Sequence, residues 1–464
     1  MARPRQGGRS LISRRAFLAG AAATPLAGVL AACAGSGAGS GRAVPDPVNF
    51  ARTRWGNDPF ARGSGSYLPI GATGADRAAL AVPVDALLFF AGEATSSAHP
   101  ATVRGAVESG RRAASELLAS GPSRAARVVI IGAGAAGLAA AAELRVAGFE
   151  PVVLEARERV GGRVNTDTSL GVAIDLGASH VHDSGPTNPL TALARQGGIA
   201  LVPAAQSSVL RDHSGRRRRD AARVSESLTK ALARVGAGTQ ADAELAGALR
   251  TEAATGQLRE PELTYAATAL IEHALGAPTT EISWRSVDEL GAAASRAGSV
   301  AALPRGGFAS LLAPLADGVD IRLRTAVVRV DWSRARNRVV TASGEVPFDR
   351  LVVTVPLGVL QAGSPAFDPP LPVSKTTAIA RLGTGTVDRL VLRFPEVFWD
   401  RDASWLGYLG TTPGEWVTWR NLFPSVGEPI LVGTNGALVA RTFDARTDEQ
   451  LVASAMSALR AMYR

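Results

Sequence analysis

The chain has 464 residues, of which 46% are apolar and 20% are charged, a composition typical of a globular protein rather than a disordered or fibrous one. Its one cysteine, Cys33, excludes an intramolecular disulfide and a cysteine-ligated zinc site, and no metal site is predicted. Five arginines and no acidic residues lie in residues 1–32, so removing that segment lowers the formal charge from +9 to +4. The remaining charge is spread thinly and does not predict nucleic-acid binding.

Residues 1–32 have the features of an export signal. A pair of arginines precedes an apolar stretch rich in Ala and Leu, and LAAC at 30–33 places small residues before Cys33. The arginine pair resembles a twin-arginine signal, and LAAC resembles a lipoprotein lipobox. A membrane-spanning anchor is disfavoured because the stretch is short and contains Pro25. We expect cleavage before Cys33, lipidation of its thiol, a flexible linker over 33–42, and residence on the outer face of the cytoplasmic membrane by the lipid anchor alone.

A dinucleotide-binding pattern begins at residue 127. RVVII at 127–131 is a short β-branched run that predicts a buried strand, and GAGAAG at 132–137 leads into a helical pattern. Gly132 permits a tight turn, Gly134 lets the backbone approach a pyrophosphate, and Gly137 lets helix and strand pack closely. The pyrophosphate would then lie at the helix N-terminus, where amide groups point outward.

A second strand, PVVLE at 151–155, ends in Glu155, eighteen positions after the last loop glycine. A carboxylate at this point accepts hydrogen bonds from ribose hydroxyls and disfavours a 2′-phosphate. The whole unit therefore predicts an adenine dinucleotide. ARERVGGRV at 156–164 and DLGASHVHD at 175–183 follow, and EARERVGGR resembles the flavin amine oxidases, the class of polyamine oxidases, monoamine oxidases and histone lysine demethylases.

Four downstream segments resemble the same family in its usual order, at 304–312, 321–332, 348–360 and 394–400. The resemblance implies an α/β fold, with a Rossmann-type FAD-binding domain plus an α+β substrate domain. It also implies FAD as the cofactor. Some monoamine oxidases bind flavin through a cysteine of the family's final segment, which has no cysteine here, so we expect FAD to be non-covalent.

Two segments resemble the end of the family but stand at the front of this chain. They are TRWGNDPFARGSGSYLPIG at 53–71 and LLFFAGEATSSAHPATVRGAVESGRRAASELL at 87–118. The chain's last pattern, LVASAMSALRAMYR, is a helix that in the family runs directly into the first of them. Joining residue 464 to about residue 43 restores the usual order, so we predict a circular permutation.

The predicted domain organisation begins with a signal over 1–32 and a linker over 33–42. The FAD-binding domain occupies 83–198, made of the permuted segment 83–120 and the Rossmann unit 125–198, and continues over 304–360. The substrate domain has its helical part over 199–303 and its remainder over 361–464 and 43–82.

The resemblance also assigns cofactor contacts. It places Arg163 around the pyrophosphate, Ser179 against the isoalloxazine, Val327 at the adenine, and Glu93 near the pyrophosphate and ribityl chain. Thr102 and its neighbour would offer amide donors to the pyrimidine ring of the flavin. The full expected set is Gly132, Gly134, Ala136, Gly137, Glu155, Ala156, Arg157, Gly162, Arg163, Gly177, Ala178, Ser179, Val327, Gly92, Glu93, Thr102 and Val103.

The implied reaction is oxidative deamination of a primary amine or polyamine by hydride transfer to flavin, giving aldehyde, ammonia and hydrogen peroxide. The partners are a small-molecule amine and oxygen or another electron acceptor, and no oligomeric state is predicted. An L-amino acid oxidase is an alternative, and it would need a buried arginine to pair with the substrate carboxylate. A further alternative is an exported FAD-binding protein or dehydrogenase with poor oxygen reactivity.

Departures from the family pattern set the catalytic candidates. Arg389 stands where the family has a lysine that holds a water at the flavin, and His180 stands where it has tryptophan. His182 matches a histidine that often faces the substrate, so Arg389 and His182 are the catalytic candidates. His273 is expected to be a partly exposed helix residue. Aromatic candidates for the pocket walls, each equally compatible with core packing, are Tyr67, Trp416 and Trp419.

Overall fold

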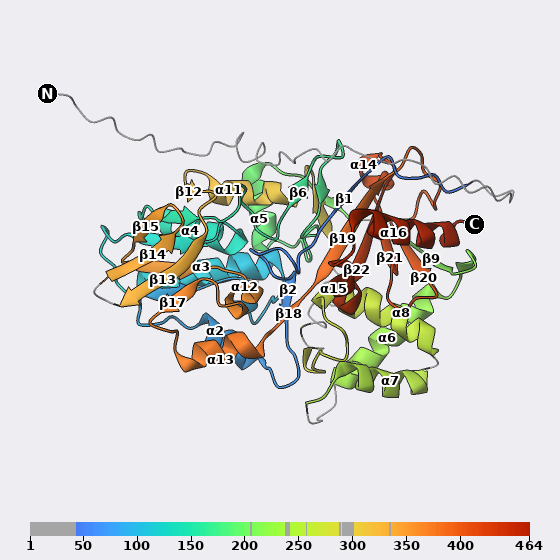
Figure 1. Ribbon diagram of the computed structural model, residues 1–464, viewed down its shortest axis with the longest axis horizontal. Helices are drawn as coiled ribbons and strands as arrows, with labels where there is room; N and C mark the ends of the chain where they lie inside the picture. The colour runs from blue at the N-terminus through green and yellow to red at the C-terminus, as the bar shows by residue number, and fades with distance from the viewer. Residues whose placement is uncertain are drawn as a thin grey trace.

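The computed structural model describes residues 43–464 apart from 205–206, 237–241, 257, 287–288, 290–300 and 334–335. The expected signal, linker and lipidation site Cys33 therefore lie outside the described residues. Across the described part of the chain, no helix is both long enough and apolar enough to cross a membrane. Figure 1 shows two parts side by side, one around α3 and α4 and the other around β19 and β22.

The first part is built on a sheet of five parallel strands. Their order is β12 (Asp320–Arg322), β5 (Val152–Leu154), β4 (Val128–Ile131), β16 (Arg350–Val353) and β3 (Leu88–Phe90). The strands β4 and β16 are almost wholly apolar because a parallel sheet is covered on both faces. This arrangement is the Rossmann-type FAD-binding fold that the sequence predicts.

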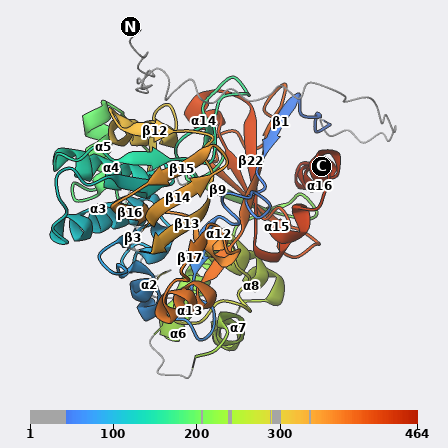
Figure 2. The ribbon, with the colours of Figure 1, turned by 60° about the vertical axis from the view of Figure 1, so that its left-hand side comes forward.

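Alternate strand residues face two separate cores. Phe89, Ile130 and Val352 pack on α3 (Val103–Ala119) and α4 (Ala135–Val146). Phe90, Ile131 and Val353 pack on the other side, against the sheet whose order is β15 (Gly344–Pro347), β14 (Arg336–Thr341), β13 (Val327–Ser333) and β17 (Ala366–Asp368). In Figure 2 this second sheet lies in front of β16 and the helices.

The second part is a seven-stranded, mainly antiparallel sheet with helices. Its order is β1 (Asn49–Arg52), β19 (Val387–Arg393), β22 (Ile430–Gly436), β21 (Thr418–Asn421), β20 (Trp405–Leu409), β9 (Ser208–Asp212) and β10 (Arg217–Arg218). Figure 1 places below it the helices α6 (Ala221–Gly236), α7 (Leu245–Gly256) and α8 (Glu260–Ala267). The described residues of the region 199–303 are thus mainly helical, and they also supply β9 and β10 to the sheet.

The early segment 43–120 contributes to both parts. Strand β1 pairs with β19 in the seven-stranded sheet, which we call the substrate sheet, whereas β3 forms an edge of the five-stranded parallel sheet. Near the other end of the chain, Arg460 of α16 (Asp448–Met462) pairs with Asp46, with 2.6 Å between nitrogen and oxygen. The two segments that the predicted permutation would separate therefore lie close together, so a short linker could join them.

The structure differs from the predicted division at two places. Strand β17 adds in parallel to β13, and α13 (Val373–Arg381) packs on α2 (Gly74–Ala81). The buried residues Leu80 and Ile379 belong to the FAD-binding core. The segments that form α2, β17 and α13 were predicted to belong to the substrate domain, but they pack on the FAD-binding domain. Their apolar residues complete the hydrophobic core on one face of the five-stranded sheet.

Candidate active site

The glycine loop after β4 has the geometry that suits a pyrophosphate. Gly132 has a φ of 102°, which favours glycine, and a Cβ on Gly137 would collide with the Gly132 carbonyl oxygen. Gly134 is the N-cap of α4, and a Cβ added there would lie 4.0 Å from the Gly161 carbonyl oxygen, an ordinary van der Waals distance. Ala136 is buried in the first turn. The loop thus combines a tight turn, close packing and an open approach to the helix N-terminus.

Glu155 follows β5 beside this loop and is 6% exposed. Its carboxylate accepts hydrogen bonds from the amides of Ala133, at 2.7 Å, and Arg157, at 2.9 Å. Burial raises the pKa of Glu155, and the two amide hydrogen bonds oppose that rise. A carboxylate offers about four acceptor positions, so lone pairs remain for ribose hydroxyls. Ala156 is partly buried, and the Arg157 side chain pairs with Asp58 at 2.7 Å.

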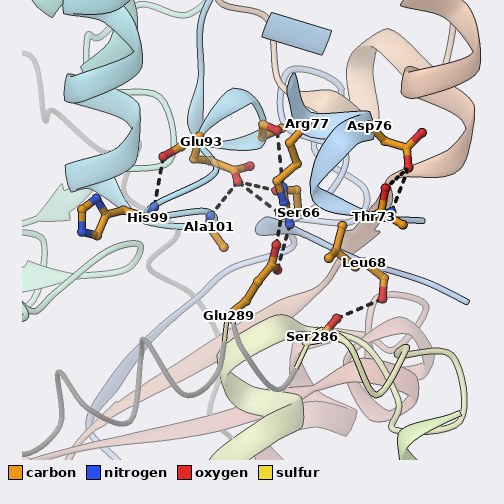
Figure 3. Close-up of polar contacts among 12 residues, drawn as sticks. Ser66, Leu68, Thr73, Asp76, Arg77, Glu93, His99, Ala101, Ser286 and Glu289 are labelled. Atoms are coloured by element: carbon orange, nitrogen blue, oxygen red, sulfur yellow. Dashed lines mark hydrogen bonds and ion pairs between the residues drawn. The ribbon is translucent and has the colours of Figure 1, made fainter. Parts of the chain in front are cut away.

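Glu93 is the centre of a second polar network, drawn in Figure 3. The carboxylate, 6% exposed, accepts hydrogen bonds from Ser66 Oγ at 2.6 Å and from the Ala101 amide at 2.9 Å. Arg163 pairs with its other oxygen at 2.8 Å. Burial raises the pKa of Glu93, but Arg163, Ser66 and Arg77 outweigh burial and lower it overall. Glu93 is therefore held as an anion at neutral pH.

A small hollow borders this network, lined by Gly92, Glu93, Arg163 and Thr354 among others. Gly92 has a φ of 131°, and a Cβ added there would meet nothing within 4 Å. A Cβ on Gly177 would collide with the Arg163 carbonyl oxygen, so these segments touch. Gly92 thus leaves its main chain accessible from the hollow, and the Glu93 carboxylate that also lines the hollow is held in place by its hydrogen bonds.

The remaining expected contacts surround the same region. Gly162 has a φ of 59°, and a Cβ added to it would lie 3.6 Å from Gly134 Cα, so the two glycine segments are adjacent. Thr102 caps α3 by accepting the Gly105 amide, which leaves the first turn, beginning at Val103, free to donate outward. These residues fit an adenine dinucleotide with a flavin. The contacts of Val327 and Ala178 with it stay predictions.

We call Gly92, Glu93, Gly134, Glu155 and Arg163 the cofactor cradle. The segment 175–183 packs against the cradle where Gly177 meets Arg163. Arg389 on β19 joins this segment to the substrate sheet. The Arg389 guanidinium donates to the main-chain carbonyls of Asp175, at 2.7 Å, and Gly177, and to Ser179 Oγ at 3.3 Å. Desolvation lowers its pKa. The donors of Arg389 are therefore engaged by protein oxygens, and its catalytic role stays a prediction.

Arg420 on β21 also reaches the segment 175–183. Its guanidinium contacts His180 Nε2 and lies over the Trp405 ring, 5.5 Å from the centroid. The Trp405 and His180 rings stack at 6.2 Å. Desolvation lowers the pKa of Arg420 to about 10, so it remains charged at neutral pH. We call Ser179, His180, Arg389, Trp405 and Arg420 the substrate-side wall.

Two other histidines border the wall. His182 is exposed and stacks on His180 with ring centroids 6.0 Å apart, and its role in substrate contact stays a prediction. His273 is partly buried, with Nδ1 3.1 Å from Thr418 Oγ1. Burial, with a smaller contribution from Arg389, lowers the pKa of His273 to about 4, so its ring is neutral.

The aromatic candidates for the pocket walls are core residues. Trp416 and Trp419 are almost fully buried and stack at 5.2 Å, and Trp416 Nε1 donates to Ser454 Oγ at 2.9 Å. Tyr67 is buried, and its hydroxyl lies 3.1 Å from Glu281 Oε2. Trp405 is the aromatic residue that the wall presents instead.

Comparison with known proteins agrees with this geometry. The family described as "Flavin containing amine oxidoreductase" matches residues 27–118 and 135–464. The chain belongs to this family. The break between the two matched stretches falls near residues 119–134, where the predicted permutation would join the family's end to its beginning.

This amine oxidoreductase has relatives among plant and human proteins. It is 31% identical over 363 residues to polyamine oxidase 3 of Oryza sativa subsp. japonica, covering 72% of both chains. It is 30% identical over 364 residues to lysine-specific histone demethylase 2 of Homo sapiens, covering 73% of this chain and 44% of that protein. A putrescine oxidase solved with putrescine has the same fold, with a TM-score of 0.59 and 22% identity over 73% of this chain and 81% of that one. The family uses FAD, so this enzyme is an FAD-dependent amine oxidase.

The sequence predicted every residue of the cofactor cradle of the amine oxidase, whose contacts with FAD stay predictions, but it did not predict Arg420 or Trp405 of the wall. Arg420 and Trp405 carry no motif, and they reach His180 only through the pairing of β20 and β21. The replacement of the family tryptophan by His180 was the available signal, since it implied a new polar partner.

Proposed function

We propose that this enzyme oxidatively deaminates a small primary amine and reduces oxygen to hydrogen peroxide. Bound FAD would supply the hydride acceptor and the electron carrier to oxygen. The amine, water and oxygen together give a carbonyl compound, ammonia and hydrogen peroxide. The observation that carries the proposal is the substrate-side wall, in which Arg389 donates to Ser179 Oγ at 3.3 Å on a segment whose Gly177 packs against Arg163 of the cofactor cradle.

The wall's charges suit the protonation state that the reaction needs. An amine loses hydride from its neutral form, and positive groups nearby disfavour a substrate ammonium. Arg389 and Arg420 supply that positive potential in a partly desolvated site. Burial lowers the pKa of both His180 and His273, so their neutral rings add no further positive charge to the site.

A polyamine is the narrower substrate that the sequence suggested, and the names of the polyamine and putrescine oxidases support it. Two guanidiniums at the wall argue against it, because a second ammonium would meet positive charge.

The test is anaerobic bleaching of the bound flavin's visible absorbance with a panel of primary amines, polyamines and amino acids. At least one class should bleach the flavin, and the same compounds should yield peroxide in air. Failure of every class to bleach the fully loaded enzyme would contradict the proposal.

A dehydrogenase with slow oxygen reactivity is a second candidate, and Arg389 favours it. Its donors are engaged by Asp175, Gly177 and Ser179, so it does not present the compact ammonium of a lysine to a bound water. Stopped-flow mixing of the reduced enzyme with oxygenated buffer should show faster reoxidation in Arg389→Lys than in wild type. Equal rates would show that this position does not control oxygen reactivity.

Export by the twin-arginine route with lipidation of Cys33 is also proposed, on the sequence of residues 1–33. Radiolabelled palmitate should label the wild-type chain in bacteria that export lipoproteins, and should not label Cys33→Ser. Equal labelling of the two would contradict lipidation at Cys33.

A further inference from the structure

A chain of hydrogen bonds joins the two wall arginines. A guanidinium has only donors, so His180 Nε2 must accept from Arg420, and the ring proton must lie on Nδ1. His180 Nδ1 lies 2.9 Å from Ser179 Oγ and therefore donates to it. Arg389 donates to the same hydroxyl at 3.3 Å. Ser179 thus accepts twice, and its own proton remains for a third partner.

The positive charge of this wall is not balanced by the protein. Among the described residues, neither Arg389 nor Arg420 forms an ion pair with a carboxylate, whereas Arg77, Arg157 and Arg163 each do. The nearby acid is Asp175, whose carboxylate is engaged by Thr166 Oγ1 at 2.6 Å and the Phe308 amide at 2.8 Å. One carboxylate against two guanidiniums leaves a net positive charge in a partly desolvated site, which favours an anionic ligand.

Resting on the proposed function, we propose that Arg420 and the Ser179 hydroxyl form a carboxylate subsite and that the substrate is a 2-amino acid. Arg420 presents a planar fork of donors that suits a carboxylate. His180 and Trp405 hold the guanidinium from two sides, so the fork is fixed before substrate binds.

The position of the subsite determines where the carboxylate lies in the substrate. Ser179 is in the segment that family resemblance places against the isoalloxazine, where the reacting carbon must be. A carboxylate bound at Ser179 is therefore attached to that carbon or very near it, which selects a 2-amino acid over a longer ω-amino acid. The reaction consumes the amino acid, water and oxygen and yields a 2-oxo acid, ammonia and hydrogen peroxide, with the hydride pair ending on oxygen.

The test compares matched pairs on the FAD-loaded enzyme: L-norleucine with pentylamine, and L-lysine with cadaverine. Anaerobic flavin bleaching should be at least about tenfold more efficient for the amino acid of each pair. Arg420→Met should lower efficiency for the amino acids by about 10- to 100-fold, the size of a lost charge-assisted hydrogen bond, and lower it much less for the matched amines, so that the preference within each pair is lost. Arg401→Met is the matched control, since the Arg401 side chain is exposed and its guanidinium packs over Phe423, 4.4 Å from the ring centroid, and not on a residue of the wall.

Binding of benzoate provides a readout independent of turnover. Benzoate should perturb the flavin spectrum and raise the melting temperature of wild type and Arg401→Met, with about 10- to 100-fold weaker binding in Arg420→Met and an intermediate value in Arg420→Lys. If the amines bleach the flavin better than their amino acids, the subsite is refuted while the proposed function stands. If nothing bleaches, the proposed function fails, and benzoate binding decides the subsite: equal affinity in wild type and Arg420→Met overturns it.

Discussion

The cofactor cradle and the substrate-side wall both contain partly buried arginines, but they balance the charge differently. In the cradle, Arg163 pairs with Glu93 at 2.8 Å, and in the adjoining network Arg77 pairs with Glu289 at 2.8 Å. In the wall, Arg389 donates to carbonyls and a hydroxyl, and Arg420 contacts an imidazole. The cradle network is electrostatically complete within the protein, whereas the wall retains charge for a ligand to neutralise.

The largest expected effect is the loss of stability when the carboxylate of Glu93 is removed from the cradle network. Glu93→Gln would leave the partly buried Arg163 without its carboxylate partner, so the free energy of unfolding should fall by about 3–5 kcal/mol. Urea denaturation of the FAD-loaded protein measures this. The control is Glu345→Gln, an exposed partner of Arg338, which should change stability by less than about 1 kcal/mol. Equal stability of Glu93→Gln and wild type would show that the network is not electrostatically coupled.

The pH dependence of folding stability provides a second test of the charge on Glu93. Because the folded-state pKa of Glu93 is lowered, its contribution is present above the unfolded-state pKa of about 4.3 and is lost as pH falls through the folded-state value. Glu93→Gln should therefore lose less stability than wild type on acidification below that pH. Parallel acid-unfolding curves would contradict this assignment.

A smaller effect is expected at the ribose end of the cradle. Glu155→Gln removes a charged acceptor, so FAD affinity should weaken by about 1.5–3 kcal/mol, or about 10- to 150-fold. Titration of apoprotein with FAD measures this, with the exposed Glu158→Gln of the same loop as control. Trichloroacetic acid should release all of the flavin as FAD. Flavin retained by the precipitate would contradict non-covalent binding.

The wall should respond differently to loss of an arginine. Arg420→Met breaks no ion pair with a carboxylate, and it removes an unbalanced cation, so stability should change by less than about 1 kcal/mol in either direction. Thermal unfolding beside Glu93→Gln tests the contrast directly. A loss of several kcal/mol would show that the wall, like the cradle, is complete without a ligand.

The smallest effect is expected from restoring the usual segment order. Moving residues 43–120 to follow Arg464 keeps the contacts of both regions and alters only loop closures, which cost little. Stability and flavin content should match wild type to within about 1 kcal/mol. Insoluble or flavin-free protein from several linker lengths would argue against the permutation.

The chain has two lysines, and arginine supplies the other 48 basic residues, so the arginine at position 389 could reflect composition alone. The environment of Lys375 argues against that explanation. Lys375 is 2% exposed, and its Nζ donates to the carbonyls of Ala79, Leu80 and Val82 at the end of α2. Three convergent carbonyls fit a compact ammonium and not a planar guanidinium. Lysine is thus present where geometry demands it, and the arginine at 389 fits a different geometry.

The sequence by itself determined the Rossmann-type unit, the cradle glycines and Glu155, because a strand, a glycine turn and a helix start depend on residues close together in the chain. It also determined the order of segments, from motifs that stand intact at both ends. Only the tertiary structure decided that β17 and α13 complete the FAD-binding core and that Arg420 meets His180, 240 positions away. Such contacts depend on which strands pair and which faces remain to be covered, and periodicity along the chain does not encode either.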